Sequence, residues 1–132
     1  MAKTICTILG ILFLIAGLLG FAAPGMMGMH LSAAHNVIHL VSGALALYFG
    51  SRGTYDAART FCIVFGIVYG LLGLMGFLAG GADYTLTLLP GQLMLGRMDH
   101  IVHIILAVLF IIGGLSPRPV IVQTPVERGT YR

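Results

Sequence analysis

Four long apolar segments set the limits on what this chain can fold into. They run over residues 4–23, 31–49, 60–79 and 98–115. A helix needs about 20 predominantly apolar residues to span a bilayer, and each segment has or approaches that length. They take up most of the 132 residues, so little chain is left for a soluble domain. We expect an all-α integral membrane protein whose four transmembrane helices form one bundle over residues 1–115.

The composition points to the same class of protein. Hydrophobic residues make up 58% of the chain and charged residues 8%, and the mean hydropathy is +1.02. A soluble domain carries about 25% charged residues. The net charge is +3, but the basic residues stand singly at helix ends, whereas a nucleic-acid site needs a basic patch. The expected partner is therefore the lipid bilayer and not nucleic acid.

The basic residues also predict the membrane topology. If the four segments alternate in direction, Arg97 alone lies on one side of the membrane. The other six lie on the opposite side with both termini: Lys3, Arg52, Arg59, Arg118, Arg128 and Arg132. The positive-inside rule makes that side cytoplasmic, in a bacterial inner or internal membrane. Residues 116–132 contain three prolines and no helical period, which predicts an extended cytoplasmic tail.

The first apolar segment resembles a signal peptide in some respects. Lys3, the apolar run and the small residues of "GFAA" imitate a cleavable signal. The run is long for such a signal, and a similar sequence recurs later in the chain. We expect a retained helix.

An internal repeat relates the two halves of the chain. The segment "KTICTILGILFLIAGLLGF" (3–21) aligns without a gap on "RTFCIVFGIVYGLLGLMGF" (59–77), and residues 35–50 align on residues 99–114. Identical pairs include Thr4 with Thr60, Cys6 with Cys62, Gly10 with Gly66, Gly17 with Gly73 and Gly20 with Gly76. Each copy holds two helices, so both copies enter the membrane in the same direction. The expected pseudo-twofold axis lies along the membrane normal.

Small residues and cysteines within the repeat have structural interpretations. Small residues four apart, such as Ala16 and Gly20, let helix backbones approach closely in lipid, so we expect tight pairing. Cys6 and Cys62 lie near the cytoplasmic ends of their helices, where a reducing compartment disfavours a disulfide. We expect them to fill a helix contact. A redox or metal pair is the alternative.

The repeat brings polar residues into register at the heads of the second and fourth helices. It aligns His35 with Asp99, Asn36 with His100, and His39 with His103. Residues four apart lie on one helix face, so each helix would present one pair toward the axis. Ionisable side chains in a membrane usually face the bundle interior. The predicted metal-ligating residues, in the non-cytoplasmic half, are His35, His39, Asp99 and His103.

Several ligands are compatible with this predicted site. Imidazole and carboxylate bind zinc, copper and iron, whereas His39 and His103 alone would suit the axial positions of haem b or a chlorophyll-type pigment. Methionine thioethers favour Cu(I), although methionine also fills gaps in packing. Accessory residues of the site are expected to be Asn36, His100, His30, Met26, Met29 and Met98.

The leading functional hypothesis is a non-enzymatic membrane protein that binds a metal, haem or pigment. The sequence carries no Walker motif, Gly-x-Ser-x-Gly, His-Glu-x-x-His or Cys-x-x-Cys. The alternative is a structural or assembly subunit of a larger membrane complex, or a homo-oligomer, in which the histidines only form hydrogen bonds between helices. A proton or ion pathway has less support, because the inner halves of the helices lack an acidic or imidazole relay.

Two short motifs carry a resemblance to a known family. Asn36-x2-His39 followed by "LVSG", and Asp99-x3-His103, resemble the signature of small bacterial four-helix membrane proteins classed as a domain of unknown function. The resemblance covers about residues 4–115. In that family an asparagine usually follows the aspartate, where this chain has His100. The resemblance therefore implies a shared core of Asn36, His39, Asp99 and His103, and it implies no activity.

Overall fold

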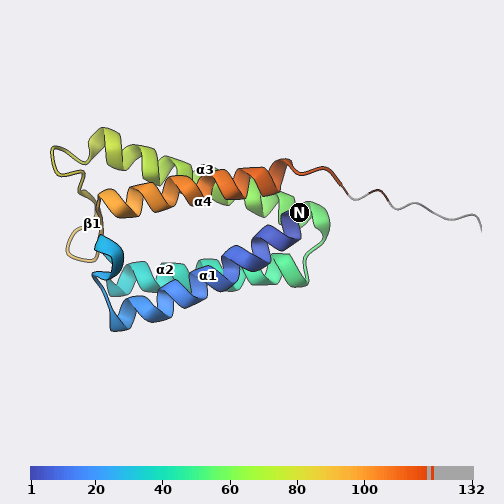
Figure 1. The fold of residues 1–132 in the computed structure, drawn as a ribbon, viewed down its shortest axis with the longest axis horizontal. Coiled ribbons are helices and arrows are strands. Elements are labelled where there is room, and N and C mark those ends of the chain that lie inside the picture. The colour runs from blue at the N-terminus through green and yellow to red at the C-terminus, as the bar shows by residue number, and fades with distance from the viewer. Residues whose placement is uncertain (119, 121–132) are drawn as a thin grey trace, which may run out of the picture.

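The computed structural model describes residues 1–118 and 120, and it contains four α-helices, a 3-10 helix and a β-hairpin in that part of the chain (Figure 1). The elements are α1 Ala2–Ala22, η1 Met26–Gly28, α2 Ala33–Ser51, α3 Tyr55–Ala79, β1 Leu86–Leu89, β2 Leu93–Leu95 and α4 Arg97–Leu115. The four predicted helices are confirmed. Helix α3 begins five residues before the apolar run, because the Thr54 hydroxyl accepts a hydrogen bond from the Ala57 N–H at 3.1 Å and caps a polar first turn.

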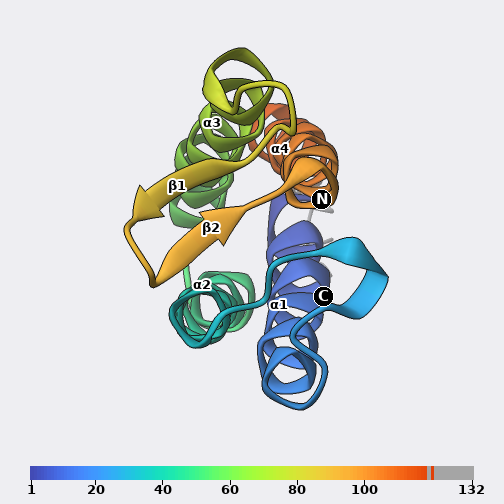
Figure 2. The same cartoon turned by 90° about the vertical axis from the view of Figure 1, so that its left-hand side faces the viewer.

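The β-hairpin corrects the expectation of a purely helical chain. Its strands pair antiparallel, with Leu86 opposite Leu95 and Thr87 opposite Met94, at one end of the bundle (Figure 2). Just before it, the Asp83 carboxylate accepts hydrogen bonds from the backbone N–H and the hydroxyl of Thr85. These bonds hold the pKa of the Asp83 carboxyl below its usual value.

Each half of the repeat forms one close pair of helices, α1 with α2 and α3 with α4 (Figure 1). Glycines of the first helix face the second helix at equivalent positions in both pairs. These contacts are Gly10 with Leu47, Gly17 with Leu40, Gly66 with Ile111 and Gly73 with Ile104. A methyl group on any of these glycines would lie 2.6–2.9 Å from the facing side chain. The repeat seen in the sequence is therefore also a repeat of packing contacts.

Aromatic rings fill the contact between the two helix pairs. They come from three helices and include Phe13, Phe61, Phe65, Tyr69 and Phe110. Phe13 of the first pair lies 6.2 Å from Phe110 of the second, measured between ring centroids. Cys6 and Cys62 lie in the same core as free thiols, with 3.3 Å between their sulfur atoms. From this core the two pairs diverge toward the end that carries the β-hairpin (Figure 1).

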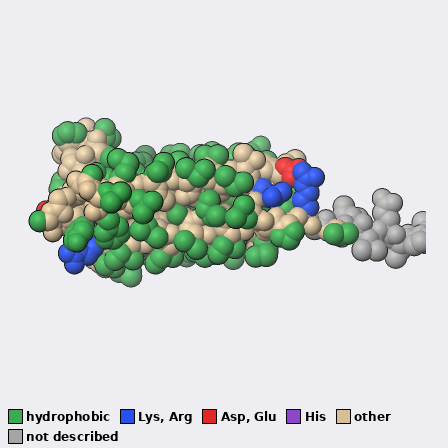
Figure 3. All heavy atoms as spheres, turned by 90° about the horizontal axis from the view of Figure 1, so that it is seen from above, with side chains coloured by type: hydrophobic (Ala, Val, Ile, Leu, Met, Phe, Trp, Pro, Cys, Tyr) green, Lys and Arg blue, Asp and Glu red, His purple; other side chains and the backbone are tan. Residues whose placement is uncertain are grey.

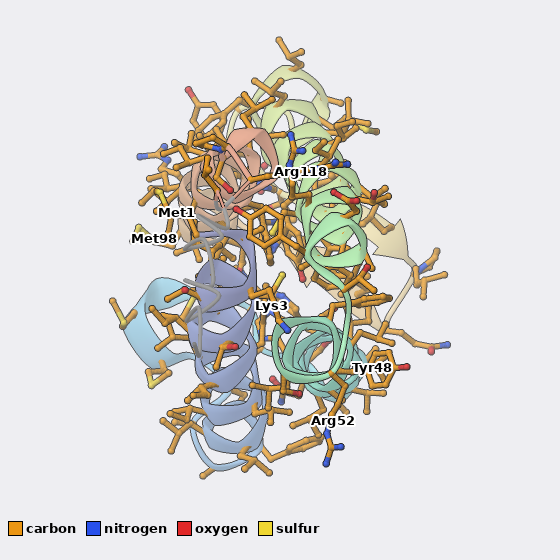
Figure 4. All side chains as sticks on the ribbon, turned by 90° about the vertical axis from the view of Figure 1, so that its right-hand side faces the viewer. Met1, Lys3, Tyr48, Arg52, Met98 and Arg118 are labelled. Carbon is orange, nitrogen blue, oxygen red and sulfur yellow. The ribbon has the colours of Figure 1, made fainter. Side chains whose placement is uncertain are left out.

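The surface is apolar around the middle of the molecule and charged at its ends (Figure 3). Helices α1, α3 and α4 are long and apolar enough to cross a membrane. Lys3, Arg52 and Arg118 lie at the end where α1 begins (Figure 4). There Arg118 forms a bidentate ion pair with Asp56, with nitrogen-oxygen distances of 3.0 and 2.9 Å. Most of the predicted tail, residues 119 and 121–132, lies outside the described residues.

Candidate metal centre

Three histidines from the two halves of the repeat meet between the helix pairs. His35 and His39 lie in the first two turns of α2, and His103 lies in the second turn of α4. One ligand atom of each lies within 4.8 Å of the other two. The His35 ring is 4.4 Å from the His39 ring and 5.9 Å from the His103 ring, measured between centroids. We call these three residues the histidine cluster.

The start of α2 positions two members of the cluster. The Ser32 hydroxyl accepts a hydrogen bond from the His35 N–H at 3.3 Å and caps the helix. With 3.6 residues per turn, His39 then follows His35 on the same helix face. The side chains of all three histidines are buried, with exposed fractions of 3% for His35, 7% for His39 and 3% for His103.

Two aromatic residues support the cluster at equivalent positions of the repeat. The Phe13 ring lies 5.4 Å from the His39 ring, and the Tyr69 ring lies 5.2 Å from the His103 ring. Neither residue was among the site residues predicted from the sequence. The signal was present in the alignment, where Phe13 falls on Tyr69 as His39 falls on His103.

A backbone carbonyl fixes the tautomer of His35. Its Nδ1 lies 2.8 Å from the carbonyl oxygen of His30. A carbonyl oxygen only accepts hydrogen bonds, so Nδ1 carries the proton and donates it, and Nε2 of the neutral ring keeps a free lone pair. This arrangement is typical of metal-binding histidines, whose second nitrogen is held by a carbonyl or carboxylate.

The other two histidines carry polar atoms without partners. Within the described part of the chain, the Nδ1 atoms of His39 and His103 are buried and form no hydrogen bond. A buried polar atom without a partner costs free energy, about 1–3 kcal/mol, and such an atom calls for an explanation. Nδ1 of His100 and Oδ1 of Asn36 are also buried without a partner, so these atoms by themselves do not single out the cluster.

Asp99 lies beside the cluster but is held mainly by backbone groups. Its Oδ2 accepts hydrogen bonds from the N–H of Gly96 at 2.8 Å and of His30 at 3.0 Å. The half-exposed His30 ring also approaches it, with Nδ1 3.5 Å from Oδ2. The other oxygen, Oδ1, is buried and has no partner among the described residues. Of the four predicted metal ligands, the structure gathers the three histidines and places Asp99 at the head of α4.

Asn36 and His100 face their own helix pairs instead of the cluster. The Asn36 amide lies against Gly20 and donates to the carbonyl of Leu31 at 3.1 Å. The His100 ring lies against Gly76, and its Nε2 is 2.9 Å from the carbonyl of Tyr84. The two aligned side chains therefore have matching structural positions.

Two cavities reach the histidine cluster from opposite sides of the bundle. One, of about 330 Å3, lies between α1 and α4 and is lined in part by Met26, Met29 and Asp99. We call it the α1/α4 cavity. The other, of about 190 Å3, lies between α2 and α3 below the β-hairpin. Met98, the remaining predicted accessory methionine, lies against Gly28 of η1.

Comparison with known proteins gives a family and no activity. No curated protein and no solved structure matches the chain. The resemblance to a family of unknown function is confirmed by a family model. The model of DUF4383, a domain of unknown function, matches residues 3–116, and because this match covers well over half of the chain, the chain belongs to the DUF4383 family.

Proposed function

We propose that this chain is a four-span membrane protein that binds one transition-metal ion through His35, His39 and His103. One observation carries the proposal: three buried imidazoles from two helices lie with their ligand atoms within 4.8 Å of one another. Buried polar side chains in a membrane interior are costly and usually have a function. Imidazole is a common ligand of zinc, copper and iron. The proposed role is binding and not catalysis, in line with the lack of a catalytic motif in the sequence.

The proposed topology places the cluster on the non-cytoplasmic side of a bacterial inner membrane. Helix α2 has 19 residues, as many as α4, and it packs against α1, which supports it as the fourth span. Its polar first turns lower its mean hydropathy. The bias of basic residues toward the end that holds Lys3 and Arg52 supports a cytoplasmic location for both termini.

The donor set suits a single ion. With zinc-nitrogen bonds of about 2.0–2.1 Å in tetrahedral geometry, ligand nitrogens lie about 3.4 Å apart. The cluster reaches this geometry if its rings close by up to about 1.4 Å, through small side-chain rotations. Asp99 would balance the charge of the ion from outside its coordination sphere, because the group of ligand atoms within 4.8 Å of one another holds the three histidines and not Asp99. Three ligands leave a fourth position open.

The geometry favours an ion over haem or a chlorophyll-type pigment. A porphyrin with two axial histidines lies flat between them, and the space around its edge must be empty of side chains. Here His35 lies within 4.8 Å of both His39 and His103, measured between ligand atoms, and would occupy that space.

A purely structural role fits two of the polar residues better than it fits the cluster. Asn36 and His100 both bond to backbone carbonyls within their helix pairs, as expected of residues that stabilise packing. In the described chain Nδ1 of His39 and of His103 lacks a partner, and so do Nδ1 of His100 and Oδ1 of Asn36. What distinguishes the cluster is that its three ligand atoms converge. The assembly-subunit hypothesis leaves this convergence of three imidazoles unexplained.

Metal titration of the purified protein tests the proposal. The protein in detergent is stripped with a chelator and titrated with Zn2+, and with Co2+ as a coloured probe of tetrahedral coordination. We expect one ion per chain. We also expect His39→Ala and His103→Ala to weaken binding by at least about 100-fold, since loss of an outer-shell partner alone costs about 10–100-fold.

His100→Asn is the matched control. It also removes a buried imidazole of α4, and Asn36 shows that an asparagine fits the equivalent position. We expect it to bind zinc as the wild type does. Substoichiometric zinc in the wild type, or equal affinity in His39→Ala and wild type, would overturn the metal site.

A further inference from the structure

The α1/α4 cavity opens sideways through the apolar surface of the bundle. Its walls include Phe13 of α1 and Leu106 of α4. At its rim, Leu12, Ile15 and Leu19 have exposed fractions of 52, 48 and 47%. In the membrane these side chains face lipid. The route into the cavity from this side therefore begins in the hydrocarbon of the bilayer.

The inner end of the cavity is polar, unlike its walls. His39, His103 and Asp99 line it, and each has a buried polar atom without a partner in the described chain: Nδ1 of the two histidines and Oδ1 of the aspartate. All three side chains are more than nine-tenths buried. The ion proposed above would take the two histidine atoms, so a ligand at this end must carry a polar atom that can contact the ion and be apolar elsewhere.

The size and charge of the cavity select among membrane amphiphiles. Its volume of about 330 Å3 is at the lower limit for small-molecule sites, about 300–1,000 Å3, which suits one ring system. No Lys or Arg is among its lining residues, so the cavity lacks the side chains that usually bind a phospholipid phosphate. The Phe13 ring, 5.4 Å from that of His39, forms part of the cavity wall beside the histidine.

We infer that the α1/α4 cavity binds the head group of a membrane-dissolved quinone, with its tail in the lipid. A quinone is flat and uncharged, and its carbonyl oxygens accept hydrogen bonds and coordinate metals. The inference rests on the proposed function, because the ion held by the histidine cluster supplies the contact. A quinone oxygen would contact that ion, to which the protein itself offers three histidine ligands.

Photolabelling in lipid nanodiscs tests the inference. The probe is a decyl-benzoquinone that carries a photoreactive azide, and labelled peptides are located by mass spectrometry. With zinc-loaded protein we expect label in residues 9–29 and 97–106, displaced by unlabelled decyl-benzoquinone. After chelation of the zinc, we expect half-maximal labelling to require at least a tenfold higher concentration of the probe.

Two variants separate the cavity from the rest of the apolar surface. Ala16→Phe fills the α1/α4 cavity, which Ala16 lines, and should weaken labelling at least tenfold. The matched control Gly70→Phe places the same side chain in a groove between α3 and α4 that has no histidine among its lining residues, and should leave labelling unchanged. If Ala16→Phe fails to bind zinc, the smaller Ala16→Leu replaces it, with an effect in the same direction.

The zinc content of each sample distinguishes the two proposals. One bound ion without label in the cavity, label spread evenly over lipid-facing peptides, or equal labelling of Ala16→Phe and wild type overturns the quinone site and leaves the metal site intact. Absence of bound zinc in the wild type overturns the metal site, and the quinone contact to the ion falls with it.

Discussion

Asp99 and His35 show how the two halves of the repeat have diverged at single residues. The alignment places them at equivalent positions, yet His35 joins the histidine cluster and Asp99 joins two backbone segments. Its Oδ2 accepts from Gly96, which precedes α4, and from His30, which precedes α2. One half of the repeat thus contributes a residue to the histidine cluster, and the other half links the two loops.

We expect Asp99→Ala to destabilise the protein. It removes two hydrogen bonds to a buried carboxylate, each of a kind that contributes about 1.5–3 kcal/mol, so the free energy of unfolding should fall by about 3–6 kcal/mol. Asp99→Asn keeps one acceptor oxygen and should cost about half as much. Unfolding in mixed micelles, followed by circular dichroism, measures both. Equal stability of Asp99→Ala and wild type would contradict the assigned role.

At the scale of elements, glycines determine how closely the helices of each pair approach. At Gly76 the His100 ring occupies the space that a side chain would need, and at Gly70 a methyl group would meet only the Ala107 methyl at 3.5 Å, an ordinary contact. Both glycines lie on α3, so they form a matched pair for substitution.

Gly76→Ala should destabilise the α3/α4 pair, whereas Gly70→Ala should not. Overpacking of this kind costs about 1–3 kcal/mol, and alanine at a site with room gains up to about 1 kcal/mol of helix propensity. Thermal unfolding of the two variants gives the comparison. Adding His100→Ala to Gly76→Ala should restore part of the loss, and a double variant no more stable than Gly76→Ala would show that the ring is not the obstacle.

The elements also show which features the sequence could predict. The helices follow from apolar runs, and the meeting of His35, His39 and His103 follows from spacing within a helix and from the repeat. The β-hairpin left only a weak signal: residues 85–88 alternate between Thr and Leu, and Pro90-Gly91 marks a turn, but the two strands have only four and three residues. The bonds of Asp99 and the α1/α4 cavity depend on loop paths and side-chain rotamers, which a single sequence does not determine.

At the scale of the whole molecule, the proposed topology predicts which end faces the cytoplasm. Cys6 and Cys62 are fully buried and should not react with maleimides, so an introduced cysteine reports on its own site. Ser51→Cys and Gln92→Cys lie at opposite ends in exposed positions. A membrane-impermeant maleimide should label Gln92→Cys in intact cells, and Ser51→Cys only after the membrane is opened. The reverse pattern would invert the topology.

A bound ion would also join the two helix pairs where they diverge, because the cluster takes His39 from α2 and His103 from α4. A ligand that binds only the folded state stabilises it by about 2.7 kcal/mol at 100 times its Kd. Zn2+ at that excess should therefore raise the melting temperature of the wild type and of His100→Asn.

Imidazoles must be unprotonated to bind a metal, so this stabilisation should be present at neutral pH and disappear as the pH falls. His103→Ala should show no increase with zinc at any pH. An increase equal to that of the wild type would mean that zinc stabilises the fold elsewhere.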